Sequence, residues 1–298
     1  MVTFPPGFDV NESVSESCFV DAAYTAFQKA QATHPPSLTP AVTPPAGYTS
    51  VAWIQMTDTF LIKVPEFYGY IAKNNADPTE HAVVFRGTSN ALEWIDNAWC
   101  TLIPCTLMPG AGRTHEGFST IYGSIKIVVD SASGADATPP TGTFAEQVAT
   151  AIRRSSTVDG VAPTKIRLLS HSLGGALMTL YVVDNQAKGS LPKATVNYTF
   201  ASPRVGDATF VAKYNSLGLQ TWRIANAPDL VPQVPLESMG YEHVNTAVDI
   251  DSTGLVAYSP TCAHLLPGYR AALLQQRIAT GDCAMRPADD AMAATRGS

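Results

Sequence analysis

The stretch Lys165–Leu180, KIRLLSHSLGGALMTL, constrains the fold more than any other part of the sequence. Residues 166–169 read as a buried strand, and the small residues around Ser172 predict a sharp turn. From Leu173 to Tyr181 the apolar residues recur with the three- and four-residue spacing of a helix. A strand that enters a helix through a tight turn is the setting in which a serine is presented as a nucleophile. We therefore expect Ser172 to be a catalytic residue.

One position of this turn departs from the usual G-x-S-x-G pattern, because Ser170 stands where that pattern has glycine. The residues two before and two after the nucleophile must be small to avoid collision, and Gly174 meets this condition. The helix that begins beside Ser172 would direct its N-terminal N–H groups at the hydroxyl and favour an oxyanion there. Taken alone, the pentapeptide is also compatible with an ordinary Ser/Gly-rich turn.

Composition sets the broad class of the protein. The 298 residues are 45% hydrophobic and 15% charged, so the chain can bury a large core but has little charge to cover its surface. This balance suits either a protein that works at an apolar interface or a secreted protein with a Ser/Thr/Ala-rich surface. The net charge of −6 and the absence of basic runs argue against nucleic acid as a partner. The sequence contains no apolar stretch of the length that a transmembrane helix needs.

The five cysteines are Cys18, Cys100, Cys105, Cys262 and Cys283. The short spacing of Cys100 and Cys105 suits a small disulfide loop, and Cys18 paired with Cys283 would join the two ends of the chain. No spacing matches a zinc site, so we expect no metal. Disulfides favour an exported protein, although the N-terminal residues lack the pattern of a signal peptide.

Apolar periodicity divides the chain into alternating helices and strands. Helices are predicted over 13–32, 90–99, 115–129, 143–154, 208–214 and 265–277, and strands over 50–56, 67–72, 81–85, 196–200, 221–225 and 242–250. The alternation predicts an α/β fold, with a mainly parallel, twisted central sheet and helices on both faces. No repeat or change in composition divides the sequence, so we expect a single domain over residues 1–298.

A serine hydroxyl becomes an effective nucleophile only when a histidine takes its proton and a carboxylate orients that histidine. In an open α/β sheet such partners lie in loops after later strands. Asp229 follows the predicted strand 221–225, and His264 lies at the start of the last predicted helix. The order Ser172, Asp229, His264 is the one expected for this arrangement.

Other residues compete for both roles. His243 lies in strand-like sequence and is the main alternative base. Asp207 is placed to begin a helix, and Asp249 and Asp251 fall at the end of an edge strand, where water would reach them. His171 is next to the nucleophile, and the turn should point its side chain away from the reaction.

Seven segments in order, from about Val83 to Leu274, resemble the class 3 lipases, the fungal-lipase-like branch of the α/β-hydrolases. They are Phe85-Arg86-Gly87-Thr88, His115-Glu116-Gly117-Phe118, Ser170–Gly175, Thr199–Gly206, Asn226–Pro235, Gly240-Tyr241-Glu242-His243, and His264-Leu265-Leu266 with Tyr269. The resemblance implies the α/β-hydrolase fold and puts His243 on a non-catalytic strand, which favours His264 as the base. It also implies an oxyanion hole made by the backbone N–H groups of Thr88 and Leu173.

The resemblance further implies a lid, a short amphipathic helix that covers the cleft in water and exposes its apolar face at a lipid surface. Residues 90–99 fit such a lid, with Leu92, Ile95 and Trp99 on one face and Trp94 outside that face. The alternative is a surface helix that packs against the core and does not respond to lipid.

Together these features predict a secreted, monomeric carboxylic-ester hydrolase that needs no cofactor. The resemblance implies acylglycerols as substrates, and hence a triacylglycerol lipase that forms an acyl-enzyme at a lipid–water interface. A phospholipase A1 or an esterase of the same fold is the alternative among enzymes. A catalytically inactive hydrolase-fold binding protein is the alternative of a different class.

Overall fold

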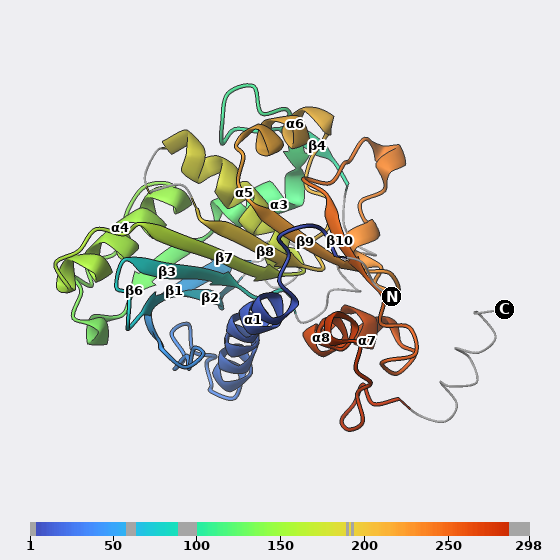
Figure 1. Ribbon diagram of the computed structural model, residues 1–298. Coiled ribbons are helices and arrows are strands. Elements are labelled where there is room, and N and C mark those ends of the chain that lie inside the picture. The colour runs from blue at the N-terminus through green and yellow to red at the C-terminus, as the bar shows by residue number, and fades with distance from the viewer. Residues whose placement is uncertain (1–3, 58–63, 89–99, 189–190, 192–193, 286–298) are drawn as a thin grey trace.

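The structure is a computed structural model that describes residues 4–57, 64–88, 100–188, 191 and 194–285 of the chain. Eight strands in this part of the chain form one central sheet (Figure 1). They are β1 (Tyr48–Thr57), β2 (Pro65–Asn74), β3 (Glu80–Phe85), β6 (Lys126–Val129), β7 (Lys165–His171), β8 (Val196–Phe200), β9 (Thr221–Asn226) and β10 (Ala247–Ile250). The strand order is β10-β9-β8-β7-β3-β2-β1-β6, and a separate two-stranded sheet pairs β4 (Leu102–Pro104) with β5 (Arg113–His115).

The sheet is parallel on one side and antiparallel on the other. Strands β3, β7, β8, β9 and β10 are parallel neighbours, whereas β2, β1 and β6 extend the sheet in antiparallel pairs. The parallel strands therefore direct their carboxyl ends to the same edge of the sheet, which is where ligand sites form in α/β folds. The expectation of a mainly parallel sheet is confirmed.

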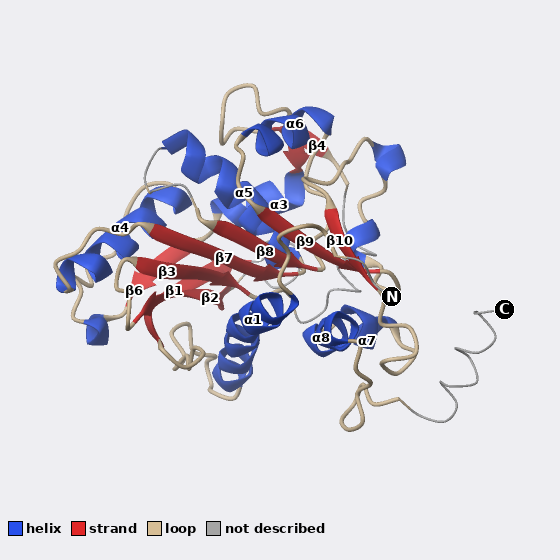
Figure 2. Cartoon of the chain, viewed as in Figure 1, coloured by secondary structure: helices blue, strands red, loops and turns tan. Residues whose placement is uncertain are grey.

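Helices cover both faces of this sheet (Figure 2). One face carries α1 (Val10–Gln31), α7 (Pro260–His264) and α8 (Leu266–Leu274), and the other carries α3 (Glu116–Gly123), α4 (Phe144–Val158), α5 (Leu173–Lys188) and α6 (Ala208–Ser216). Local signals fix several helix starts. The Asp9 carboxylate accepts a hydrogen bond from the Glu12 amide at the start of α1, and Thr143 and Glu146 form a capping box at the start of α4.

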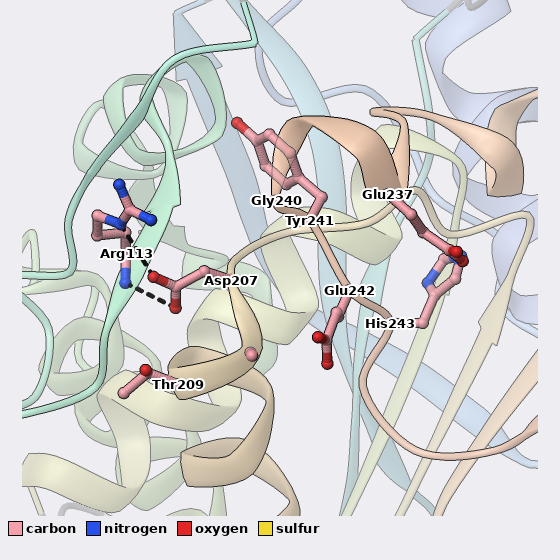
Figure 3. A pocket seen from close by; sticks show the side chains of 9 residues that line it. Arg113, Asp207, Thr209, Glu237, Gly240, Tyr241, Glu242 and His243 are labelled. Carbon is pink, nitrogen blue, oxygen red and sulfur yellow. Dashed lines mark hydrogen bonds and ion pairs between the residues drawn. The ribbon is translucent and has the colours of Figure 1, made fainter.

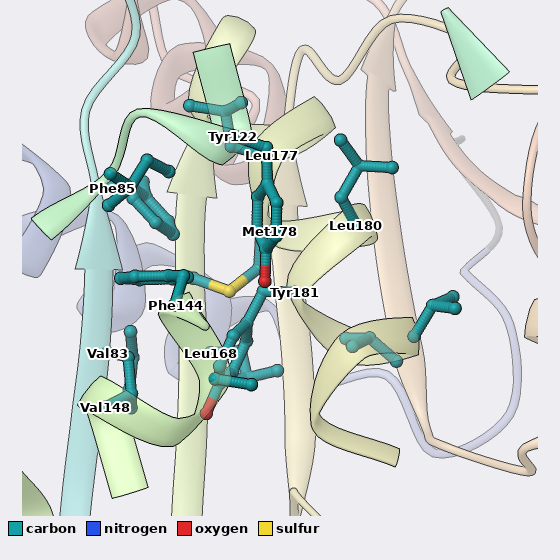
Figure 4. Close-up of a cluster of buried hydrophobic side chains, with 14 of the residues drawn as sticks. Val83, Phe85, Tyr122, Phe144, Val148, Leu168, Leu177, Met178, Leu180 and Tyr181 are labelled. Atoms are coloured by element: carbon teal, nitrogen blue, oxygen red, sulfur yellow. The ribbon is translucent and has the colours of Figure 1, made fainter. Parts of the chain in front are cut away.

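Each face of the sheet has its own apolar core. Figure 4 shows part of the core beneath α4 and α5, where Phe85 from β3 meets Phe144 and the α5 residues Leu177 and Tyr181. The rings of Phe144 and Tyr181 meet edge to face with their centroids 5.5 Å apart. The second core joins α1 and α8 to the opposite face. Burial on both sides explains why the strands of the parallel half are almost continuously apolar.

Three predicted segments differ from the structure. The helix predicted over 115–129 ends at Gly123, and Lys126–Val129 forms strand β6, because its β-branched residues pair with β1. Only Ala247–Ile250 of the predicted strand 242–250 forms a strand. The helix predicted over 265–277 is α8, which starts at Leu266 after a break from α7, because Pro267 cannot continue an existing helix.

Both disulfide predictions are wrong, because Cys283 pairs with Cys262. Cys18, Cys100 and Cys105 carry no disulfide. Cys100 and Cys105 flank strand β4, whose extended backbone advances about 3.3 Å per residue and so separates the two residues instead of folding them back on each other. The loop that the sequence suggested as a disulfide turn is a strand instead.

Breaking the disulfide by the pair of substitutions Cys262→Ser and Cys283→Ser should lower the free energy of unfolding by about 3 kcal/mol. The bond closes a loop with a sequence separation of 21, and a loop of this size restricts the unfolded chain to that extent. Urea unfolding of the two proteins measures the difference. Cys18→Ser, on the exposed surface of α1, is the control and should leave the stability unchanged; equal stability of all three proteins would contradict the prediction.

Candidate active site

Ser172 occupies a strained turn between β7 and α5. Its φ of 56° lies in the left-handed region that residues other than glycine rarely adopt. The Ser172 amide donates to the Phe200 carbonyl at 2.9 Å, and the Gly175 amide donates to the Ser172 carbonyl at 2.8 Å. These two bonds hold the turn against β8 and start the helix. The side chain of Ser172 is therefore fixed at the carboxyl edge of the sheet.

Glycines let the chain after β3 pack directly on this turn. A Cβ atom on Gly87 would lie 2.6 Å from the Ser172 Cβ, and one on Gly174 would lie 2.8 Å from the Phe85 Cβ. Both distances are shorter than side chains tolerate, so these positions require glycine. The close packing puts Thr88, the residue after Gly87, beside the nucleophile turn.

Ser170, the residue that departs from the usual pattern, lies in the regular part of the sheet. It pairs with Phe85 in β3 and Thr199 in β8, and its side chain is fully buried. Its hydroxyl has no hydrogen-bond partner within the described residues. The backbone there does not need glycine, so the serine changes the packing below the turn without changing the turn itself.

The structure brings Ser172, His264 and Asp229 together. His264 Nε2 lies 3.0 Å from Ser172 Oγ, and His264 Nδ1 lies 2.9 and 3.1 Å from the two carboxylate oxygens of Asp229. All three side chains are buried. A carboxylate that accepts from Nδ1 keeps the proton of a neutral imidazole on that nitrogen, which leaves the lone pair of Nε2 facing the serine hydroxyl.

Surrounding residues fix the acid and the histidine. Asp229 lies in the loop after β9 and also accepts hydrogen bonds from the Tyr269 hydroxyl at 2.7 Å and the Val231 amide at 3.0 Å. The side chain of Asn226, the last residue of β9, donates to the Ala263 carbonyl at 2.7 Å and so ties the acid loop to the residue before His264. His264 is the last residue of α7 rather than the first of the final helix.

His171 and Tyr24 form a buried network behind the triad. The Tyr24 hydroxyl lies 2.7 Å from His171 Nδ1, and His171 Nε2 lies 2.8 Å from the His264 carbonyl, to which it donates. The Tyr24 oxygen also accepts from the Gly87 amide at 2.8 Å. Burial, together with the nearby His264, holds the pKa of His171 well below its ordinary value, so the ring stays neutral. Tyr24 is 147 residues from His171 along the chain, and no sequence motif marks it as part of the site.

The alternative base and acid lie elsewhere. His243 Nε2 donates to the Pro232 carbonyl at 2.6 Å, and the ring lines a surface pocket of about 670 Å³ (Figure 3). Asp207, on the wall of the same pocket, caps α6 and bonds to Arg113. A second Ser–His contact, His81 Nε2 to Ser155 Oγ at 3.4 Å, lies at the opposite end of β3 from the nucleophile turn.

Several buried histidines should make the protein sensitive to acid. Burial lowers the pKa of His81 and of His115 to about 4 and that of His243 to about 3, from an ordinary value of 6.5. Because the folded-state pKa lies below the unfolded value, the stability from each neutral ring is fully present above pH 6.5 and is lost as the pH falls towards 4.

We therefore expect the melting temperature to fall between pH 6.5 and pH 4, and the slope to be shallower in His81→Gln. His81 is chosen because it lies away from the triad. Thermal unfolding followed by circular dichroism across this pH range measures both slopes. Equal slopes would show that protonation of His81 is not linked to unfolding.

The candidate lid, with Leu92, Trp94, Ile95 and Trp99, lies outside the described residues and stays a prediction.

Within the described part of the chain, no helix has the length and apolarity to cross a membrane. That part also contains no cluster of three or more His, Cys, Asp or Glu side chains that would hold a metal ion.

The mainly parallel sheet with helices on both faces, and the serine on the turn between β7 and α5, define an α/β-hydrolase fold. Solved fungal lipases share this architecture. A complex of Rhizomucor miehei lipase with its propeptide superposes with a TM-score of 0.58 at 20% sequence identity, over 83% of this chain and 70% of that one. Identity at this level supports the fold alone.

Sequence comparison gives the family. A family model described as Lipase (class 3) matches residues 82–239, which is more than half of the chain, and the protein belongs to that family. It is 33% identical over 188 residues to a rice (Oryza sativa subsp. japonica) protein named phospholipase A1-II 4, covering 57% of this chain and 43% of that protein. It is 39% identical over 101 residues to the secreted mono- and diacylglycerol lipase A of Penicillium cyclopium, covering 34% and 32%. The chain thus matches less than half the length of these relatives.

Proposed function

We propose that the protein is a carboxylic-ester hydrolase that uses Ser172 as the nucleophile, His264 as the base and Asp229 as the orienting acid. The observation that carries the proposal is the continuous chain of contacts from Ser172 Oγ through both ring nitrogens of His264 to the Asp229 carboxylate. Membership in the class 3 lipase family supports the same chemistry.

The reaction follows from these contacts. His264 Nε2 takes the hydroxyl proton as Ser172 Oγ attacks the ester carbonyl, and Asp229 stabilises the imidazolium that forms. His264 then gives this proton to the leaving alcohol, and the acyl group stays on Ser172. Water, activated by His264 in turn, releases the acid and restores the serine. Apart from water and the ester, every group that the proposed reaction uses is a side chain or a backbone amide, so the reaction needs no cofactor.

The backbone amides of Thr88 and Leu173 are proposed to bind the oxyanion. Leu173 is the first residue of α5, where helix N–H groups have no partner within the helix. Thr88 follows Gly87, whose Cα packs against Ser172. Both residues are therefore next to the nucleophile turn, as an oxyanion hole requires.

We propose acylglycerols as the substrates and a lipid surface as the place of action. Two exposed leucines support this: Leu230, 47% exposed, follows Asp229 directly, and Leu265, 39% exposed, follows His264. A lid over 90–99, which the sequence predicts, would add apolar surface to the site. The Penicillium relative is named a secreted acylglycerol lipase, and the Cys262–Cys283 disulfide also favours secretion. The rice relative makes phospholipase A1 activity the alternative.

Hydrolysis assays separate these substrates. A series of p-nitrophenyl esters from short to long acyl chains, with and without detergent, tests the ester hydrolase. A rate that jumps when tributyrin exceeds its solubility limit supports a lipase, whereas smooth saturation supports an esterase. Release of the sn-1 fatty acid from phosphatidylcholine supports a phospholipase A1. A protein that hydrolyses none of these would refute the proposal.

A further inference from the structure

Arg86, which follows strand β3, is a cation buried completely below the site. Its Nε donates to the Phe67 carbonyl at 3.0 Å, and its Nη1 donates to the Gly87 carbonyl at 2.7 Å. Its Nη2 lies 3.0 Å from a carboxylate oxygen of Glu66, an ion pair without the alignment of a hydrogen bond. A buried cation is costly unless such partners satisfy it, so the guanidinium is held in one place.

Two aromatic rings, those of Phe27 and Tyr68, clamp the guanidinium. Its central carbon lies 3.5 Å from the centre of the Phe27 ring and 4.5 Å from that of the Tyr68 ring. Phe27 belongs to α1 and Tyr68 to β2, so the clamp spans two elements of the fold. The planar fork of Arg86 is therefore fixed both in position and in orientation.

The bond to Gly87 acts on the peptide group that carries the Thr88 amide. A trans peptide is planar, and its C=O and N–H bonds point in opposite directions. A hydrogen bond that fixes the Gly87 carbonyl thus fixes the direction of the Thr88 N–H. Tyr24 holds the preceding peptide through the Gly87 amide. Side chains therefore bind both the N–H and the C=O of Gly87. These bonds restrain a residue type whose backbone is otherwise the most flexible.

We propose that Arg86 is a positioning residue that fixes the peptide plane between Gly87 and Thr88 and so aims the Thr88 N–H at the oxyanion of the substrate. The positive guanidinium that donates to the Gly87 carbonyl also polarises this peptide, which makes the Thr88 N–H a stronger donor. Arg86 does not touch the substrate in this arrangement. The inference rests on the proposed function, because it assigns a role within the oxyanion hole of that reaction.

Arg86→Lys and Glu66→Gln are the matched variants for a test. Lysine keeps the charge, but its single ammonium cannot reproduce the planar fork that bonds Phe67 and Gly87 together. Glu66→Gln weakens the ion pair and leaves the bond from Arg86 to Gly87 in place. Both variants disturb the same buried ion pair. A loss of ester hydrolysis that appears only in Arg86→Lys therefore reports on the peptide group between Gly87 and Thr88 rather than on stability.

Two substrates separate positioning from a general loss of structure. One is a p-nitrophenyl ester, and the other is its thionoester, in which a sulfur atom that accepts hydrogen bonds weakly replaces the carbonyl oxygen. In Arg86→Lys we expect kcat for the ester to fall about 10- to 100-fold with KM nearly unchanged, because the donor is misaligned rather than removed. The rate on the thionoester should fall little, so the ratio of the ester rate to the thionoester rate should fall by the same factor of about 10 to 100 as kcat for the ester. Glu66→Gln should keep the ratio of the wild type.

The outcomes are distinct. Equal losses on both substrates, or an unchanged ester rate in Arg86→Lys, would overturn the inference while leaving the proposed function intact. Absence of hydrolysis by the wild type and by Glu66→Gln would instead overturn the proposed function. The amide nitrogen shift of Thr88 in NMR spectra depends on the bond that the Gly87 carbonyl accepts and needs no substrate. It should change in Arg86→Lys and stay constant in Glu66→Gln, and a constant shift in both would refute the positioning role.

Discussion

Replacing Ser172 by alanine is expected to lower kcat for ester hydrolysis by about 10⁶-fold, because removal of the nucleophile of a serine triad has an effect of this size. The turn is held by backbone bonds to Phe200 and Gly175, which alanine keeps, so the protein should remain folded. Hydrolysis of p-nitrophenyl butyrate measures the rate, and the circular dichroism spectrum checks the fold.

A second serine provides a matched control for this experiment. Ser155 is buried and also lies near a histidine, His81, but the pair is far from the proposed site. Ser155→Ala should therefore keep full activity. His264→Ala should cost about as much as Ser172→Ala, and the double substitution should cost little more, because triad residues act as a unit. Wild-type hydrolysis in Ser172→Ala would show that another group is the nucleophile, whereas no hydrolysis by the wild type would favour the inactive, hydrolase-fold binding protein.

Local patterns made the centre of this site predictable from the sequence. The strand, turn and helix around Ser172 lie within sixteen residues, and each part has its own periodicity or small-residue signal. The mainly parallel sheet followed from the alternation of elements. The structure also brings Asp229 and His264 to Ser172, the partners chosen because they follow later strands at the same edge of the sheet.

Contacts between distant segments could not be predicted in the same way. Tyr24 comes into the site through the packing of α1 against the sheet, and nothing local to this residue specifies that contact. Arg86 lies in the predicted segment 85–88, but the rings that pack on it, Phe27 and Tyr68, come from α1 and β2. The pairing of Cys262 with Cys283 depends on the path by which the chain after α8 comes back to α7, so the spacing of the cysteines alone did not predict it. The sequence predicts helix for residues 126–129, which form a strand, because four residues are too few to distinguish the helical period from the alternation of a strand.

Asparagine in place of Asp229 should lower kcat by about 10⁴-fold while leaving the fold intact. The carboxylate accepts hydrogen bonds from His264, Tyr269 and Val231, which occupy both of its oxygens. Asparagine has one acceptor oxygen, so its NH₂ group must face one of these donors or turn towards the histidine. If the NH₂ group faces His264, it donates to Nδ1 and so favours the tautomer with the proton on Nε2. In that tautomer Nε2 cannot take the proton of Ser172.

Tyr269→Phe is the comparison that isolates this effect. It removes one donor to Asp229 and leaves the negative charge and the bond to His264 in place, so kcat should fall less than tenfold. Burst kinetics with a p-nitrophenyl ester would place the loss in Asp229→Asn in the acylation step, where the histidine first acts as a base. If Asp229→Asn and Tyr269→Phe lowered kcat equally, Asp229 would be acting as a packing residue of the loop, and the orienting acid would have to be sought elsewhere.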